Sequence, residues 1–187
     1  ALYAAALVAF KFLAILPGVT EVRPGVALVV LCSLLFGPAG AWGAAIGNTI
    51  GDLAGGLGPG TAVGFVANFL FGLVPYRLAR ALGVEDDPAP RDLRTGAAFL
   101  ACAAAASAAC AVTVGAGIQA LGLWPSAYNV LTPLILATNS LVTLALTPFL
   151  LRAIYPRVSA LGLRYQDVLD LPPRARGALR GGAAAVA

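Results

Sequence analysis

The residues best suited to chemistry lie in one short stretch, where two polar side chains recur at a helical spacing. Asn48 and Asp52 are four residues apart, and each directly follows a glycine, Gly47 or Gly51. On a helix this spacing places both side chains on one face. An aspartate within a membrane span costs roughly 2.5–3.5 kcal/mol on insertion scales and so indicates a functional site. A carboxylate beside an amide can bind the polar edge of a small ligand.

Glycines also recur at this spacing, at Gly43, Gly47, Gly51 and Gly55. In water such a helix would be weak, because each interior glycine costs about 1 kcal/mol relative to alanine. In a bilayer the missing side chains allow a neighbouring helix to approach closely. We therefore expect a central helix whose glycine face packs on its neighbours and whose polar stripe faces a cavity.

The composition is that of an integral membrane protein. Of the 187 residues 60% are hydrophobic and 11% are charged, and the mean hydropathy is +0.90, whereas soluble domains are about 25% charged. The apolar runs are long and rich in alanine, which predicts helical spans rather than a barrel. Histidine is absent, so we expect no metal and no other cofactor. The three cysteines are expected to pack as small apolar residues.

Six apolar segments can be drawn, at about residues 1–16, 22–36, 39–55, 61–82, 93–121 and 128–155. The predicted fold is all-α: a polytopic membrane protein with six transmembrane helices in one compact bundle over residues 1–155. An arginine-rich cytoplasmic tail, residues 156–187, is expected to be partly disordered. The second and third segments are shorter than the ~20 residues that a span needs, so they require flanking protein or a thin bilayer.

Arginine sets the predicted orientation. Four arginines bracket the linker between the fourth and fifth segments (Arg77, Arg80, Arg91 and Arg94), and six lie at or beyond the end of the last segment (Arg152, Arg157, Arg164, Arg174, Arg176 and Arg180). The positive-inside rule makes both regions cytoplasmic, and six spans then place both termini in the cytoplasm. The net charge of +4 therefore reports orientation, and nucleic acid is not an expected partner.

With this topology the polar residues converge on the outer half of the bundle, which describes a cup open to the outside. The candidate ligand contacts are Lys11, Glu21, Arg23, Asn48, Asp52, Asn68, Tyr128, Asn129 and Asn139. Each also has a structural alternative. The asparagines could join helices by hydrogen bonds, Glu21 could pair with Arg23, Lys11 could snorkel to the headgroups, and Tyr128 with Trp124 could form an aromatic belt.

Two ladders of small residues indicate close helix contacts. Ala1, Ala5 and Ala9 recur in the first segment, and four alanines at positions 97, 101, 105 and 109 recur in the fifth. Both faces are flat enough for packing within the bundle or for docking another membrane protein.

Arg-Pro-x-x-Ala-Leu at residues 23–28, followed by Phe-Gly-Pro-x-Gly-Ala-x-Gly-Ala-x-x-Gly-Asn-x-x-Gly-Asp at residues 36–52, resembles a known family over roughly residues 1–155. The chain resembles the substrate-binding (S) components of energy-coupling factor (ECF-type) ABC importers for vitamins. Glu-x-Arg at residues 21–23 and the asparagine of the third segment are most similar to the branch proposed to carry queuosine precursors.

The resemblance implies a function and partners. An S component captures a scarce micronutrient from outside the plasma membrane of a prokaryote. It then docks on a membrane scaffold subunit joined to two ATPases, with the ladder Ala1, Ala5 and Ala9 as its docking face. The chain has no Walker motif, so the ATPases would be separate proteins. The ligand could be a deazapurine or another water-soluble heteroaromatic vitamin.

Three other classes compete with this interpretation. A stand-alone small-solute transporter or channel would work without ATPases and often has a duplicated half, and no clear internal repeat is present. An intramembrane enzyme needs a nucleophile with a base, or a metal cluster, which the absence of histidine disfavours. A purely structural membrane protein would leave the outward convergence of polar residues unexplained.

Overall fold

The computed structural model describes residues 2–9, 14–16, 20–21, 23–53 and 56–169. Side chains of the two segments 14–16 and 20–21 are outside this description. Three residues of the sequence predictions, Ala1, Lys11 and Gly55, also lie outside the described residues, as does the predicted tail from residue 170 onward.

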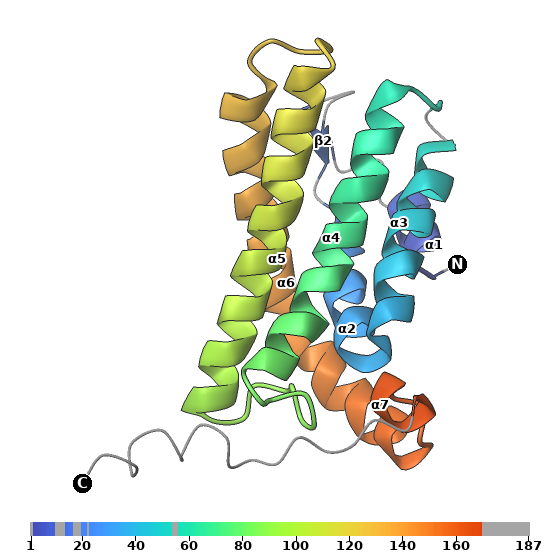
Figure 1. Ribbon diagram of the computed structural model, residues 1–187, viewed down its shortest axis with the longest axis vertical. Helices are drawn as coiled ribbons and strands as arrows, with labels where there is room; N and C mark the ends of the chain where they lie inside the picture. The colour runs from blue at the N-terminus through green and yellow to red at the C-terminus, as the bar shows by residue number, and fades with distance from the viewer. Residues whose placement is uncertain (1, 10–13, 17–19, 22, 54–55, 170–187) are drawn as a thin grey trace, which may run out of the picture.

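The described chain is a helical bundle with one short hairpin. Its helices are α1 (Leu2–Ala9), α2 (Val26–Phe36), α3 (Pro38–Leu53), α4 (Pro59–Ala81), α5 (Leu93–Ala120), α6 (Ala127–Ala160) and α7 (Tyr165–Val168). The strands are β1 (Ala14–Leu16) and β2 (Thr20–Glu21). The long helices α4, α5 and α6 run the length of the bundle, α1 lies against α3, and α7 lies under the opposite end from the hairpin (Figure 1).

Three helices are long and apolar enough to cross a membrane, namely α4, α5 and the helix that begins at Ala127. The others described are shorter: α2 has 11 residues and α3 has 16. At 1.5 Å per residue these two reach only about 16 and 24 Å, against a hydrocarbon core of about 30 Å. The helical architecture is confirmed apart from the short hairpin, while the count of six spans stays a prediction.

The ends of the first and last predicted helices were wrong. The first was expected to continue to Leu16, but Ala14–Leu16 pairs as a strand with Thr20–Glu21 in antiparallel register. Short β-branched-containing segments such as these readily adopt extended backbone when a partner strand is available. The last helix was expected to end near residue 155, but α6 continues through Pro156 to Ala160. Proline is tolerated in membrane helices because neighbouring groups satisfy the freed backbone.

An internal proline in α4 shows how a neighbouring side chain provides hydrogen-bond partners for backbone groups of a helix. Pro75 lies inside the helix, and Ser33 from α2 inserts beside it. The Ser33 hydroxyl donates a hydrogen bond to the Gly72 carbonyl at 2.6 Å and accepts one from the Tyr76 backbone N–H at 3.1 Å. The hydroxyl thus bridges a donor and an acceptor that would otherwise pair within the helix, and it fixes α2 against α4.

Small residues allow α1, α2, α3 and α4 to approach closely. A Cβ added at Gly47 would lie 2.9 Å from the Tyr3 ring, and one at Gly51 would lie 2.9 Å from Leu7. The predicted glycine face therefore packs on α1 at these two positions. Gly43 has no neighbour within 4 Å of an added Cβ, so the contact does not extend to the start of the ladder.

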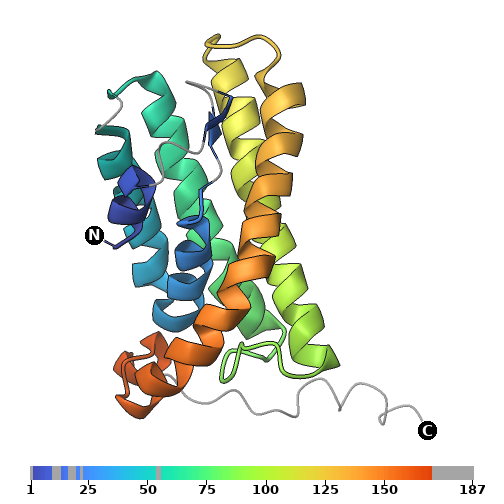
Figure 2. The same ribbon diagram turned by 180° about the vertical axis from the view of Figure 1, so that it is seen from behind.

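The C-terminal helix α7 closes the end of the bundle opposite the hairpin (Figure 2). The ring of Tyr165 covers Gly37, which has a positive φ of 53°, and a Cβ there would lie 2.7 Å from the ring. The Tyr165 hydroxyl donates to Glu85 Oε2 at 3.2 Å. These contacts tie the turn between α2 and α3 to the loop that precedes α5.

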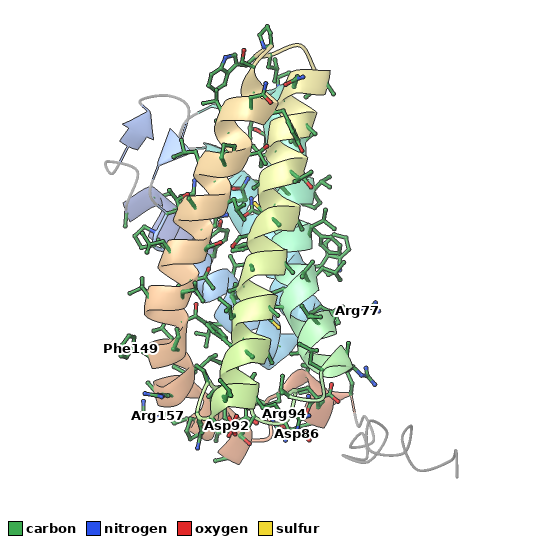
Figure 3. The ribbon with its side chains drawn as sticks, turned by 90° about the vertical axis from the view of Figure 1, so that its left-hand side faces the viewer. Arg77, Asp86, Asp92, Arg94, Phe149 and Arg157 are labelled. Carbon is green, nitrogen blue, oxygen red and sulfur yellow. The ribbon has the colours of Figure 1, made fainter. Side chains whose placement is uncertain are left out.

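The same end carries the arginines. Arg77, Arg94 and Arg157 lie there together with Asp86 and Asp92 (Figure 3). Asp92 caps α5, because its carboxylate accepts from the Thr95 backbone N–H at 2.8 Å. Hydrogen bonds from Thr95 lower the pKa of Asp92 below its ordinary value. This end is thus built from caps and loop contacts.

Candidate functional site

A cavity of about 390 Å³ opens among the helices toward the end that carries the hairpin. Its rim includes Gly56 and Gly58 from the loop between α3 and α4, and Trp124 from the loop between α5 and α6. Both loops lie at the upper end of the bundle, away from α7 (Figure 1). Helices α1 to α6 each contribute at least one lining residue.

A chain of polar side chains crosses one wall of the cavity. The Arg23 Nη1 atom donates to Asn48 Oδ1 at 3.4 Å, and Asn48 Nδ2 donates to Asp52 Oδ2 at 3.1 Å. Asn48 is only 2% exposed, and its two amide atoms are oriented by a cation on one side and a carboxylate on the other. The wall therefore presents a guanidinium donor and a carboxylate acceptor at fixed positions.

A second polar group comes from α1 and α4. The Tyr3 hydroxyl donates to Asn68 Oδ1 at 2.8 Å, while Asn68 Nδ2 donates to the Gly64 carbonyl of its own helix at 2.9 Å. Tyr3 and Asn68 are 7% and 5% exposed. The ring of Tyr3 reaches this position by lying over Gly47, so the glycine face of α3 positions a hydroxyl at the cavity.

The wall from α5 and α6 is mostly apolar. Val114, Ile118, Leu131 and Ile135 line it, with the Trp124 ring at the rim. Thr138 and Asn139 add polar atoms on α6, and Asn139 Nδ2 donates to the Cys110 sulfur at 3.7 Å. A flat ligand can place its ring against this apolar wall and its polar edge toward the asparagines, which is the usual construction of a small-molecule site.

The space around Asn48 depends on a glycine. A Cβ added at Gly64 would lie 2.8 Å from Asn48 Nδ2 and 3.7 Å from Asp52 Oδ2. Any larger residue at this position would push the amide out of line with Arg23 and Asp52. Gly64 therefore sets the width of the cavity between α3 and α4.

The structure brings together five of the nine residues predicted from the sequence. These lining residues are Arg23, Asn48, Asp52, Asn68 and Asn139. Lys11 lies outside the described residues, and Glu21 lies in β2 with its side chain undescribed. Tyr128 and Asn129 are exposed and do not line the cavity. On α1, Ala5 and Ala9 are exposed while Tyr3 and Leu7 are buried.

Sequence reasoning missed several lining residues with polar side chains, among them Tyr3 and Thr138. Tyr3 gave a weak signal, as a phenol in a segment of alanine, valine and leucine. Thr138 precedes the predicted Asn139 and gave none of its own, because threonine is common in membrane helices, where its hydroxyl bonds the preceding turn. Here it does so with the Leu134 carbonyl at 2.9 Å.

The arrangement suits binding. Among the described residues, no group of three histidine, cysteine, aspartate or glutamate side chains could hold a metal ion. The cavity lining contains one carboxylate, Asp52, and one guanidinium, Arg23. A carboxylate joined to a guanidinium through an amide presents complementary donors and acceptors to a polar ligand.

Comparison with known proteins identifies the family. A family model described as QueT transporter matches residues 1–156 of the chain. No curated protein and no solved structure matches it.

Proposed function

The chain belongs to the QueT transporter family, and on that premise we propose that it is the membrane-embedded, high-affinity substrate-binding (S) subunit of an energy-coupling factor importer. A transporter family is not an enzyme family, and the chain acts on a small solute by binding and moving it. The observation that carries the proposal is the cavity of about 390 Å³, which Arg23, Asn48, Asp52, Asn68 and Asn139 line from the turn before α2 and from α3, α4 and α6.

The walls of the cavity favour a flat, water-soluble heteroaromatic ligand. Asp52 accepts hydrogen bonds from ring or amino N–H groups of the ligand, and the asparagines pair with its remaining edge. The aliphatic side chains of α5 and α6 and the Trp124 ring cover its faces. A modified nucleobase of the deazapurine type, such as a queuosine precursor, has this combination of a polar edge and apolar faces. The cavity volume of about 390 Å³ lies in the lower part of the ~300–1,000 Å³ range of ligand pockets and is compatible with a ligand of this size.

The distribution of charge supports an orientation with the cavity toward the outside. Among the described residues, the basic side chains other than Arg23 belong to the end that carries α7, the loop before α5 and the end of α6. The positive-inside rule favours a cytoplasmic location for this end in a prokaryotic cell. The subunit then captures its ligand from the external medium.

Helix α1 supplies the face that docks on the energy-coupling module. Ala5 and Ala9 are exposed on this helix, so a helix of a membrane scaffold subunit can approach its backbone closely. Two ATPase subunits bound to the scaffold supply the energy, since this chain carries no Walker motif.

Mass spectrometry of the small molecules released by denaturing the purified protein tests the binding function. The expected result is one heteroaromatic compound at about one copy per chain. The Asp52→Ala variant should lose it, while Asp86→Ala, an exposed aspartate at the opposite end, should retain it. Equal retention by both variants, or none by the unaltered protein incubated with a deazapurine base, would contradict a binding site at this cavity.

A second experiment separates the proposal from a stand-alone transporter. Proteoliposomes that contain only this chain should bind the compound without accumulating it. Addition of the scaffold and ATPase subunits with ATP should start uptake. Uptake by the chain alone at the same rate would overturn the S-subunit assignment.

A further inference from the structure

We propose that a second cavity, at the end opposite the ligand cavity, binds the headgroup of an anionic phospholipid. This hollow of about 520 Å³ lies where α3 begins and α4 ends, beside α7, and its lining includes Pro38, Tyr76, Arg77, Arg80, Tyr165 and Leu169. We call it the arginine hollow. Lipid binding at the arginine hollow does not depend on which ligand occupies the other cavity.

Arg77 is the principal contact. It lies on the last turns of α4, is exposed, and projects away from the bundle (Figure 3). Its Nε atom donates to the Tyr76 hydroxyl at 3.3 Å, and its guanidinium carbon lies 5.8 Å from the centre of the Tyr76 ring. Within the described part of the chain no ion pair involves Arg77. The tyrosine thus orients a guanidinium whose outer N–H groups suit a phosphate.

Arg80 follows three residues later and therefore projects from the same side of α4. Its Nε atom lies 3.6 Å from Glu85 Oε2, and the two side chains are 34% and 10% exposed. Arg77 and Arg80 both line the arginine hollow, whereas Glu85, which pairs with Arg80, is not among its described lining residues. The hollow therefore presents guanidinium groups, which suit the phosphodiester of a lipid headgroup.

Aromatic rings form the wall behind the arginines. Tyr76 and Tyr165 are 7% and 6% exposed, and their ring centres lie 5.7 Å apart in an edge-on arrangement. The Tyr165 hydroxyl donates its hydrogen bond to Glu85. The wall is therefore rigid, which lowers the entropy lost when a headgroup is bound.

The surface next to the arginine hollow suits acyl chains. Trp42 lies about one turn after Pro38 on α3, is 53% exposed, and packs on Phe69 of α4 with ring centres 4.8 Å apart. Leu73 lies one turn before Arg77 on α4. A phospholipid can place its tails along this apolar surface while its phosphate reaches Arg77 and Arg80. Basic pockets of this kind on the cytoplasmic side of membrane helices recognise anionic headgroups.

Native mass spectrometry of the purified full chain, with phosphatidylglycerol or phosphatidylcholine added, tests the site. We expect preferential retention of phosphatidylglycerol, and Arg77→Gln should weaken it at least about fivefold through loss of charge-assisted hydrogen bonds. Arg77→Lys should recover only part of it, because lysine keeps the charge but lacks the planar fork. Arg157→Gln is the matched control, as Arg157 is an exposed arginine at the same end on α6.

Three results would overturn the proposal. An equal loss in Arg157→Gln would mean that the whole basic end attracts lipid without a site. Equal retention of the two lipids by the unaltered protein would remove headgroup recognition. Displacement of phosphatidylglycerol by millimolar inorganic phosphate would identify a free-anion site instead. Binding at the ligand cavity should be unchanged in Arg77→Gln, so failure here is distinguishable from failure of the proposed function.

Discussion

The two ends of the bundle contain similar polar groups but use them differently. At the cavity end, Arg23, Asn48 and Asp52 come from α3 and the turn before α2, and they line an internal space. At the arginine end, charged groups pair with partners three or four residues away in the chain, as in Arg91 with Asp87 and Arg164 with Asp167. The second set lies on the surface, where ion pairs contribute about 0–1 kcal/mol each.

Under the proposed function, this difference separates ligand recognition from stabilisation and orientation. Buried polar side chains are costly unless they are hydrogen-bonded, and those around the cavity are held in place by hydrogen bonds to one another. Surface arginines cost little and fix the direction of insertion. A substitution of the same type should therefore have different effects at the two ends.

The largest expected difference is between aspartates. Asp52→Ala should lower affinity for the co-purified ligand more than about tenfold, because it removes an acceptor and frees Asn48 from its orientation. Asp86→Ala should leave affinity unchanged. Isothermal titration with the compound identified by mass spectrometry measures both, and unchanged affinity in Asp52→Ala would remove this residue from the site.

Glycines provide the next comparison. Gly64→Ala should reduce affinity about fivefold, as overpacking of about 1 kcal/mol displaces Asn48. Gly96→Ala is the control at the arginine end, where an added Cβ has no neighbour within 4 Å. Thermal unfolding should show a small gain for Gly96→Ala, since alanine favours helix. Identical ligand affinities for the two variants would show that the position of Asn48 does not depend on the space that Gly64 leaves between α3 and α4.

Tyrosines test the contribution of α1. Tyr3→Phe removes the hydrogen bond to Asn68 and should weaken ligand binding about threefold, the effect of one neutral hydrogen bond. Tyr128→Phe, at an exposed residue outside the cavity lining, should have no effect on affinity. A loss in Tyr128→Phe that exceeds the loss in Tyr3→Phe would favour the sequence-based assignment of Tyr128 over the structural one.

The smallest expected effect is at a surface ion pair. Arg91 Nε lies 3.2 Å from Asp87 Oδ2, with side chains 54% and 43% exposed. Arg91→Gln should change the free energy of unfolding by no more than about 0.5 kcal/mol and should not alter ligand affinity. A larger loss of stability in a detergent unfolding assay would show that the loop between α4 and α5 contributes more than surface pairing allows.

The sequence by itself determined the helical membrane character, the approximate positions of α2 to α6 and the placement of Asn48 and Asp52 on one face of a helix. Long apolar runs leave only helices or barrels as spanning structures, and a four-residue repeat fixes which side chains share a face. Gly47 and Gly51 could be assigned to a packing face for the same reason, and that face packs on α1.

Only the tertiary structure decided which faces of different helices meet. Helical periodicity gives the direction of a side chain relative to its own axis, but not the rotation of that axis against its neighbours. Tyr3 enters the cavity and Tyr128 does not, although the predicted topology placed Tyr3 at the cytoplasmic end of the first span and Tyr128 near the outer polar region. The contact of Tyr165 with Gly37 joins positions far apart in the sequence, and such long-range packing leaves no periodic signal in either segment.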